Sequence, residues 1–446
     1  MENPTTAIAR PGSGQRTSNE LRFAGQRDPL TGLFEQDYLI QELERTLQKS
    51  RTQPVTATLA LMQLENFYEI RTWVGKPEAD LLLSDIAHLL EKSLPESVIL
   101  CRWQHYEFAV LLFNESSLNA RLITDRVKQA LQSALSTSIP PQLELKCGVG
   151  LTAVDRNIPS VEVLFARARH KLSLAHYRGE NNVQLTALAA TSPGIVLKQL
   201  HKALRNHQLQ LSFQPTVSLR EDGLQHYEIR SFLPGENYSL PTPLLFETAV
   251  QNALGENIDR YIIGQALQLL RRQNQNSLRL TVNLTQNTVV SPHFFDWLET
   301  TIHQHSDLGE QLVFQISEID VLIAQHHMDY FCNQLARLNI KLSISNFGCT
   351  PDPFRYLSLL RAHFVKLDVS LLEKIDVDPV KRDQLIQIIA RLHQNGLRAI
   401  AGMVENMSLL PWLWKARVNF VQGYCMQKPE SSLNFEFLKD ETVGLH

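Results

Sequence analysis

The sequence predicts two α/β domains in one chain, an α/β sandwich followed by a (β/α)8 barrel. The length of 446 residues exceeds the usual size of about 150 residues per domain. A segment of small residues with a proline and a glycine, near 186–196, separates two strongly patterned regions. A few strands interleave with helices before this segment, whereas eight strand-like runs alternate with helices after it.

The first region shows the pattern of a sandwich that contains an antiparallel hairpin. Leu39, Leu43 and Leu47 recur every four residues and indicate an amphipathic helix near 35–48. Apolar runs predict strands near 58–64, 98–101, 108–113 and 143–153, and helices near 79–94, 117–135 and 160–178. The second and third strands lie at hairpin spacing, although the segment between them contains no Gly, Asn or Asp.

The second region shows the pattern of a closed barrel rather than a doubly wound sheet. Strand-like segments recur near 209–217, 226–232, 278–284, 311–318, 340–345, 363–368, 397–401 and 418–423. Helical patterns lie between most of them, for example at 258–272, 326–338 and 382–395. Chemistry in such barrels sits at the C-terminal ends of the strands. The residues there are Glu228, Asn283, Gln315 to Glu318, Ser345, Asn346, Lys366 to Asp368, Gly402 to Glu405 and Gln422.

Composition and charge exclude several classes of protein. Hydrophobic residues make up 43% and charged residues 20%, which is typical of a soluble globular protein. We do not expect direct nucleic-acid binding, because the net charge is −3 and the sequence contains no basic run. No apolar run approaches the roughly 18 residues that cross a bilayer. The five scattered cysteines indicate a reducing cytoplasm, and we expect a disordered leader at 1–22 and a tail at 441–446.

The chain resembles the tandem GGDEF–EAL family of diguanylate cyclases and cyclic di-GMP phosphodiesterases. The segment Arg27 to Leu33, RDPLTGL, is similar to the start of a GGDEF domain, and Phe213-Gln214-Pro215 is similar to the start of an EAL domain. Later EAL-type segments follow in order at 282–285, 316–318, 365–368 and 421–424, with Pro429. The resemblance implies a palm-like GGDEF sandwich over 23–186, a linker at 187–196 and a TIM-like EAL barrel over 197–440.

In the GGDEF half, the resemblance places the active site on residues that cannot serve it. The signature hairpin of the family corresponds to Gln104, His105, Tyr106 and Glu107, so both glycines are lost and Tyr106 replaces the metal-binding acid. Gln63 stands where the family has a metal-binding Asp, and Gln is a poor ligand for Mg²⁺. We therefore expect no cyclase activity.

In the EAL half, the resemblance likewise implies a site that has lost its metals. Glu228 remains in the block Glu228-Ile229-Arg230, but the family's phosphate-binding Arg becomes Phe232. The other metal-collecting acids correspond to Gln315, Ser345, Asn346 and Gly402, while Asn283, Lys366 and Gln422 are retained. One carboxylate and one amide cannot neutralise two divalent cations. We expect no bound metal, no Mg²⁺ cofactor and an ion pair between Glu228 and Lys366.

Three functions follow from this resemblance. The first is a non-enzymatic regulator of cyclic di-GMP signalling, of the biofilm or motility type, that acts through protein partners or as a homodimer. The second is a cyclic di-GMP receptor whose barrel binds without hydrolysing, with weak affinity expected. Its ligand-binding residues are expected to be Gln214, Pro215, Arg230, Asn283, Lys366, Gln422 and Pro429. The third is a residual cyclic di-GMP phosphodiesterase.

Overall fold

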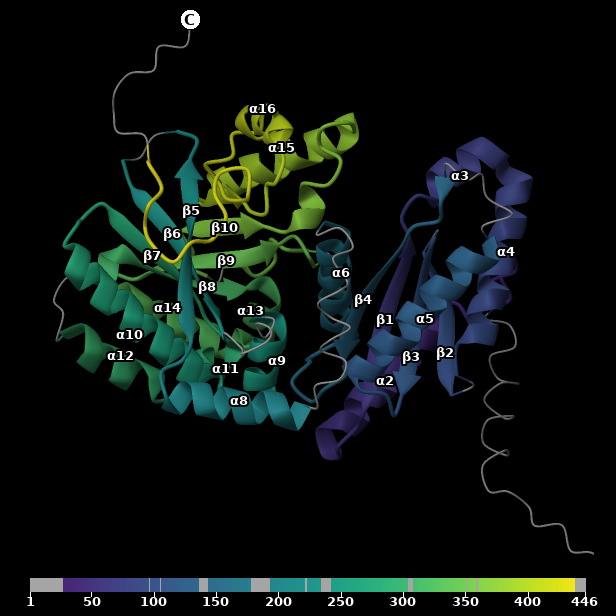
Figure 1. Ribbon diagram of the computed structural model, residues 1–446, viewed down its shortest axis with the longest axis horizontal. Helices are drawn as coiled ribbons and strands as arrows, with labels where there is room; N and C mark the ends of the chain where they lie inside the picture. Colours follow the sequence, from purple (N-terminus) through teal and green to yellow (C-terminus); the bar gives the residue numbers. More distant parts are fainter. Residues whose placement is uncertain are drawn as a thin grey trace, which may run out of the picture. The chain divides into compact units, whose positions relative to one another are not determined.

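The chain divides into two compact units, residues 1–179 and 180–446, in a computed structural model (Figure 1). The structure describes residues 27–95, 97–104, 106–135, 143–177, 193–220, 223–233, 242–303, 308–350, 352–357 and 360–437. The predicted leader 1–22, the tail 441–446 and residues 187–192 of the predicted linker lie outside the described residues. Among the described helices, none is long and apolar enough to cross a membrane.

The first unit is a four-stranded antiparallel sheet covered by helices, which confirms the predicted α/β sandwich (Figure 1). The strand order is β2-β3-β1-β4, with the almost wholly buried β1 in an inner position. The elements are α2 (Gln36–Thr52), β1 (Ala57–Leu64), α3 (Phe67–Val74), α4 (Lys76–Ser93), β2 (Val98–Gln104), β3 (Glu107–Phe113), α5 (Ser117–Leu135), β4 (Cys147–Ala153) and α6 (Val161–Tyr177).

The RDPLTGL segment folds into a turn that is anchored to the edge strand of this sheet. Asp28 accepts hydrogen bonds from the backbone and the hydroxyl of Thr31, at 2.8 and 2.6 Å. Its carboxylate also pairs with Arg102 of β2 at 2.8 Å. Burial acts to raise the pKa of Asp28, but these hydrogen bonds and Arg102 lower it below its ordinary value.

The second unit is a closed eight-stranded barrel in the order β10-β11-β12-β5-β6-β7-β8-β9 (Figure 1). Its strands are β5 (Gln210–Ser218), β6 (Gln225–Phe232), β7 (Leu278–Asn283), β8 (Leu312–Ser317), β9 (Lys341–Phe347), β10 (Phe364–Leu367), β11 (Arg398–Ala401) and β12 (Phe420–Val421). The larger helices around them are α8 (Pro193–Arg205), α9 (Thr242–Gln251), α10 (Gly255–Gln273), α12 (Phe294–His303), α14 (Gln325–Arg337) and α15 (Pro379–Gln394). The shorter helical segments are α11 (Gln286–Val289), η2 (Leu308–Gln311), α13 (Glu318–Ile323), η4 (Val369–Leu371), η5 (Met407–Leu409) and α16 (Leu410–Lys415).

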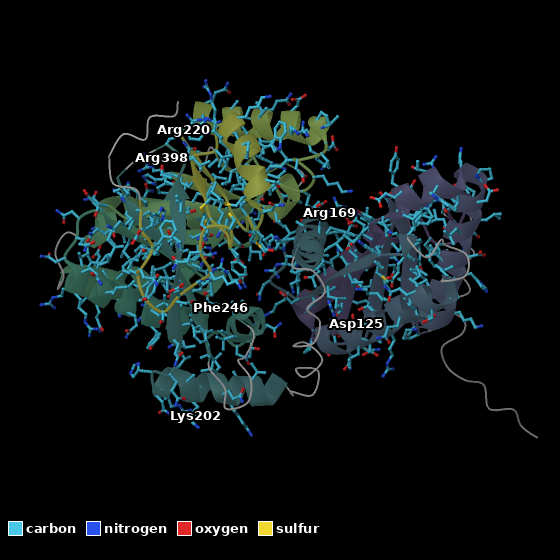
Figure 2. All side chains as sticks on the ribbon, turned by 45° about the horizontal axis from the view of Figure 1, so that its top comes forward. Asp125, Arg169, Lys202, Arg220, Phe246 and Arg398 are labelled. Carbon is cyan, nitrogen blue, oxygen red and sulfur yellow. The ribbon has the colours of Figure 1, made fainter. Side chains whose placement is uncertain are left out.

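Two features of the barrel differ from the sequence-based expectation. Strand β5 pairs antiparallel with both β6 and β12, because the connection from Ser218 to Gln225 is too short for a parallel crossover. Helix α8 begins at Pro193, inside the predicted linker 187–196, since proline at the first position suits a helix start. The buried Val196, Leu200 and Ala203 attach α8 to the barrel core, and Lys202 projects from the same helix (Figure 2).

The C-terminal segment of the described chain returns to the first two barrel strands. Phe213 of β5 and Glu430 exchange two backbone hydrogen bonds, at 2.7 and 3.0 Å. The hydroxyl of Tyr227 on β6 accepts a hydrogen bond from the backbone N–H of Phe435 at 3.1 Å. The Tyr227 ring also meets Phe437 edge to face, with 5.2 Å between the ring centres. The segment therefore packs against both strands.

Candidate functional site

The mouth of the barrel carries a layer of polar side chains above an apolar plug. Glu228 of β6 and Lys366 of β10 make contact although their strands are not neighbours in the barrel, so the two side chains meet across its interior. Val313, Phe364, Ile400 and Phe420 form the apolar cluster beneath them. The barrel thus positions several strand ends over one buried floor.

A continuous chain of hydrogen bonds joins five of these side chains. Lys366 Nζ donates to Glu228 Oε2 at 2.6 Å, which confirms the expected ion pair. Asn283 Nδ2 donates to Glu228 Oε1 at 3.0 Å, and Gln315 Nε2 donates to Asn283 Oδ1 at 2.7 Å. Ser343 Oγ donates to Gln315 Oε1 at 3.0 Å. The chain ends in an ammonium at one side and a hydroxyl at the other.

The charge of Glu228 is stabilised by its neighbours. Burial acts to raise the pKa of this carboxyl, whose side chain is only 7% exposed. Lys366 and Arg230, together with the hydrogen bonds from Lys366 and Asn283, hold the pKa of Glu228 well below its ordinary range. Burial lowers the pKa of Lys366 although its contact with Glu228 acts to raise it. The 2.6 Å contact pairs the ammonium with the carboxylate, so the two charges neutralise each other.

Two further amides line the mouth near β5 and β12, and each keeps one oxygen without a partner among the described residues. Gln214 Nε2 donates to the carbonyl of Gln427 at 3.4 Å, and Gln422 Nε2 donates to Thr216 Oγ1 at 3.1 Å. Both glutamines are at most 2% exposed, yet their Oε1 atoms accept no hydrogen bond from the described residues. Unsatisfied buried oxygens of this kind mark a place where an N–H donor could bind.

The remaining predicted residues surround this chain without joining it. Arg230 lies one pleat beyond Glu228, with its guanidinium 4.0 Å from the carboxylate and 38% of its side chain exposed. Ser345 and Asn346 end β9, where Asn346 takes a left-handed backbone with φ of 56°. Gly402 follows β11 and is buried. Pro215 faces Tyr227 across the β5–β6 pair, and Pro429 precedes the returning C-terminal segment.

Buried acids outside the chain hold the loops of the mouth. Glu318 accepts hydrogen bonds from the backbone of Gly348 and Cys349, at 2.7 and 3.1 Å, and from the Thr350 hydroxyl. Burial raises the pKa of Glu318 although these bonds act to lower it. Asp368 caps η4 through Ser370, at 3.0 Å to the backbone and 2.6 Å to the hydroxyl. Both acids therefore hold the loop backbone through hydrogen bonds to its N–H groups.

Another buried acid, Asp259 of α10, supports the loop that follows Asn283. Its Oδ2 atom accepts from the backbone and hydroxyl of Thr285 and from the hydroxyl of Thr288, at 2.7, 2.8 and 2.5 Å. Burial raises the pKa of Asp259 to about 7, although these three hydrogen bonds act to lower it.

In the first unit, the predicted site is filled by an aromatic side chain. The Tyr106 ring packs against Phe67, with 4.8 Å between ring centres, and its hydroxyl accepts from Arg71 at 3.0 Å. Gln63 at the end of β1 pairs with Glu107 of β3 in the sheet register. Glu107 in turn pairs at 3.3 Å with Arg169, which projects from α6 (Figure 2). Among the described residues of this hairpin, side chains rather than glycines stand where the resemblance expects the phosphate approach.

The predicted hairpin is confirmed, since β2 and β3 pair antiparallel with a register shift between Arg102 and Gln104. Gln104 ends β2, whereas the predicted site residue His105 lies outside the described residues.

Sequence reasoning missed three residues that complete the two sites. Ser343, which ends the hydrogen-bonded chain, sits in the apolar run of β9 and carries no signal there. Thr216 is a β-branched residue typical of any strand. Arg71 lies in α3, and its contact with Tyr106 depends on the fold. No sequence motif identifies these three residues; only the folded structure shows their contacts.

The resemblance implies two divalent cations in the barrel mouth, and the residues present do not fit them. Glu228 is the one carboxylate among the described side chains of the hydrogen-bonded chain, and its two oxygens already face an ammonium and an amide N–H. Gln315 and Ser343 are neutral, and Asn283 turns its oxygen toward Gln315. Hard cations need several negative oxygen ligands.

Comparisons with known proteins agree with this architecture. Residues 25–182 match the family described as diguanylate cyclase, GGDEF domain, and residues 197–429 match the EAL domain family. The EAL domain of FimX from Pseudomonas aeruginosa, bound to c-di-GMP, is 31% identical; the match covers 55% of this chain and 99% of that domain, with a TM-score of 0.52.

Two further relatives match over most of this chain. The S helix-GGDEF-EAL part of LapD from Vibrio cholerae, bound to c-di-GMP, is 20% identical over 92% of this chain and 98% of that chain, with a TM-score of 0.53. The cyclic di-GMP phosphodiesterase NbdA from Pseudomonas aeruginosa is 23% identical over 92% of this chain, but only 53% of NbdA is covered. The chain spans about half the length of such curated relatives. It belongs to the tandem GGDEF–EAL family of cyclic di-GMP signalling proteins.

Proposed function

We propose that the chain is a non-enzymatic regulator in cyclic di-GMP signalling that acts through protein partners or as a homodimer. The observation that carries this proposal is the 2.6 Å pair between Glu228 and Lys366. Two-metal hydrolysis of a phosphodiester needs anionic ligands that hold both cations and activate a water. Here the one retained acid is neutralised by a lysine, so neither the cations nor the activated water has a place.

The same conclusion applies to the first unit on independent grounds. Condensation of two GTP molecules into cyclic di-GMP, with release of two pyrophosphates, needs metal-bound phosphates that approach the backbone closely. Tyr106 packs against Phe67 with a tilted ring and accepts a hydrogen bond from Arg71, so a bulky ring fills that approach. The free thiols of the five cysteines support a reducing, cytoplasmic setting for this regulator.

A turnover assay tests the proposal. Purified protein is incubated with GTP and, separately, with cyclic di-GMP in the presence of Mg²⁺ or Mn²⁺, and products are separated by chromatography. We expect neither cyclic di-GMP from GTP nor linear dinucleotide from cyclic di-GMP above a no-protein control. Linear dinucleotide that disappears in Glu228→Gln would overturn the proposal in favour of a residual phosphodiesterase.

A second candidate function, a cyclic di-GMP receptor, is favoured by one specific feature of the mouth. The buried Oε1 atoms of Gln214 and Gln422 lack donors among the described residues, and a guanine edge carries N–H groups. Glu228, Lys366 and Arg230 together carry a net charge of +1, which favours a phosphate without metal. The solved complex of the FimX EAL domain with c-di-GMP supports this reading.

Titration calorimetry with cyclic di-GMP, with and without Mg²⁺, separates the two functions. We expect weak or undetectable binding, because Phe232 supplies no charge where the family places an arginine. Undetectable binding at about 100 μM ligand limits the contribution of the site to roughly 5.5 kcal/mol. Micromolar binding that Arg230→Ala abolishes, while the exposed control Arg271→Ala on α10 keeps it, would establish the receptor instead.

A further inference from the structure

Gly402 and Lys366 occupy space that they could not share if residue 402 carried a side chain. A Cβ atom built on Gly402 would lie 2.5 Å from Cε of Lys366, and 3.4 and 3.5 Å from its Cγ and Cδ. The lysine therefore runs directly over the glycine on its way to Glu228. The backbone of Gly402 does not adopt a positive φ, so space rather than backbone conformation requires a glycine here.

The Glu228 carboxylate, which the lysine pairs on its other oxygen, sets the direction of the hydrogen bonds in the chain. An ammonium only donates and a carboxylate only accepts, so Glu228 takes a donor on each oxygen. Asn283 must then present its NH₂ to Glu228 and its oxygen to Gln315, and Ser343 donates at the end. Each amide oxygen that could have bound a cation is thereby turned to a donor.

We propose that Lys366, admitted by the missing side chain of Gly402, is a built-in cation that takes the place of the metal ions in this barrel. The proposal deepens the proposed loss of turnover and rests on the barrel mouth being the former metal site. The proposal predicts something that the loss of the metal-binding acids alone does not predict. Restoring acids at 345 and 346 leaves Glu228 occupied, so a metal site also requires that Lys366 be removed or displaced.

The test is metal binding by the full chain, with Mn²⁺ alone as the probe and no nucleotide present. The acid pair Ser345→Asp with Asn346→Asp is made in three backgrounds: otherwise unchanged, with Lys366→Met, and with Gly402→Ala. Binding is measured by calorimetry and by the change in melting temperature on adding MnCl₂. Gly264→Ala, on α10 with open space around it, is the matched glycine control.

We expect the acid pair alone, with or without Gly264→Ala, to bind Mn²⁺ no better than the wild type. Adding Lys366→Met should tighten Mn²⁺ binding at least about tenfold, in the range by which partners of metal ligands change affinity. Gly402→Ala should tighten it in the same direction, because the new methyl group displaces the lysine from Glu228. If the Lys366→Met protein does not fold, the Gly402→Ala background still tests whether displacing the lysine restores Mn²⁺ binding.

Two results would overturn the proposal. Tight Mn²⁺ binding by the acid pair with Lys366 and Gly402 intact would show that the lysine does not exclude metal. Unchanged binding in the Gly402→Ala background would show that the glycine does not admit the lysine. Because no nucleotide is present, these outcomes are independent of the turnover assay, whose failure would contradict only the proposed function.

Discussion

The two units differ in what occupies the positions that the resemblance assigns to their functional sites. In the first unit, the ring of Tyr106 packs on Phe67 and fills the position with side-chain volume. In the barrel, Glu228 and Lys366 keep a polar, hydrogen-bonded arrangement around a neutralised charge. The first unit thus fills this position by packing, whereas the barrel keeps a hydrogen-bonded polar surface at its strand ends. The barrel mouth is therefore the place where a ligand could still be recognised.

The largest effect that this comparison predicts is on the barrel. Lys366→Met leaves the Glu228 carboxylate buried without its partner, which typically costs about 3–5 kcal/mol. We expect that loss in the free energy of unfolding of the barrel, measured by urea denaturation. The paired variant with Glu228→Gln and Lys366→Met removes both charges and should lose much less. Equal losses in the single and paired variants would show that the charge pair is unimportant.

The second prediction concerns how the free energy of unfolding depends on pH through Asp259, the buried acid of α10 that holds the loop after Asn283. The pKa of Asp259 rises from 3.8 to about 7 on folding, so the unfolded chain releases a proton that the folded chain retains. Stability from this group is thus complete below pH 3.8 and falls by about 1.4 kcal/mol per pH unit up to about pH 7. Asp259→Asn should remove this slope.

The measurement for Asp259 is urea unfolding of the wild type and Asp259→Asn at several pH values from 4 to 8. The stability of the variant relative to the wild type should increase toward pH 7 and then level off. A constant difference across this range would contradict the raised pKa, whatever the absolute cost of the substitution.

The third prediction tests whether Tyr106 acts as filler. Tyr106→Ala should lower the stability of the first unit by about 1–3 kcal/mol, because the ring contact with Phe67 is lost. Tyr106→Phe keeps the ring and loses the hydrogen bond from Arg71, worth about 1 kcal/mol. Thermal unfolding compares the two variants. Equal losses would assign the stabilisation to the hydroxyl rather than to packing.

The smallest effect is expected at Glu107, the surviving signature acid of the first unit. Its ion pair with Arg169, whose side chain is 43% exposed, is of the kind that contributes at most about 1 kcal/mol. Glu107→Gln should therefore leave the melting temperature of the first unit nearly unchanged. A decrease of several degrees would show that Glu107 stabilises the first unit by more than an exposed ion pair does.

Most of the architecture could be predicted because buried strands appear as apolar runs. The helix predicted at 117–135 has those bounds in α5, and the strand predicted at 58–64 corresponds to β1. The direction of β5 was missed, although the short connection to β6 already excluded a parallel crossover. Helix α8 was missed because its proline and glycine were interpreted as linker signals rather than a helix start.

The site was less predictable than the fold. The pair of Glu228 and Lys366 followed from strand ends that share one cavity. The part of Ser343 did not follow, since a serine within an apolar strand has no distinguishing pattern. Gly402 was interpreted only as a lost acid, and its steric relation to Lys366 depends on coordinates to within an ångström. Local patterns specify strands, whereas distances between side chains depend on how the strands close.

The C-terminal return has a practical consequence for where this barrel can be cut. The EAL family match ends at residue 429, yet Glu430 is hydrogen-bonded to Phe213 along a part of β5 that the two-residue β12 does not reach. A fragment ending at 429 would expose that strand edge and leave Tyr227 without Phe435 and Phe437. We expect such a fragment to self-associate and one ending at 437 to remain monodisperse. The family match thus ends before the segment 430–437 that packs against the first two barrel strands.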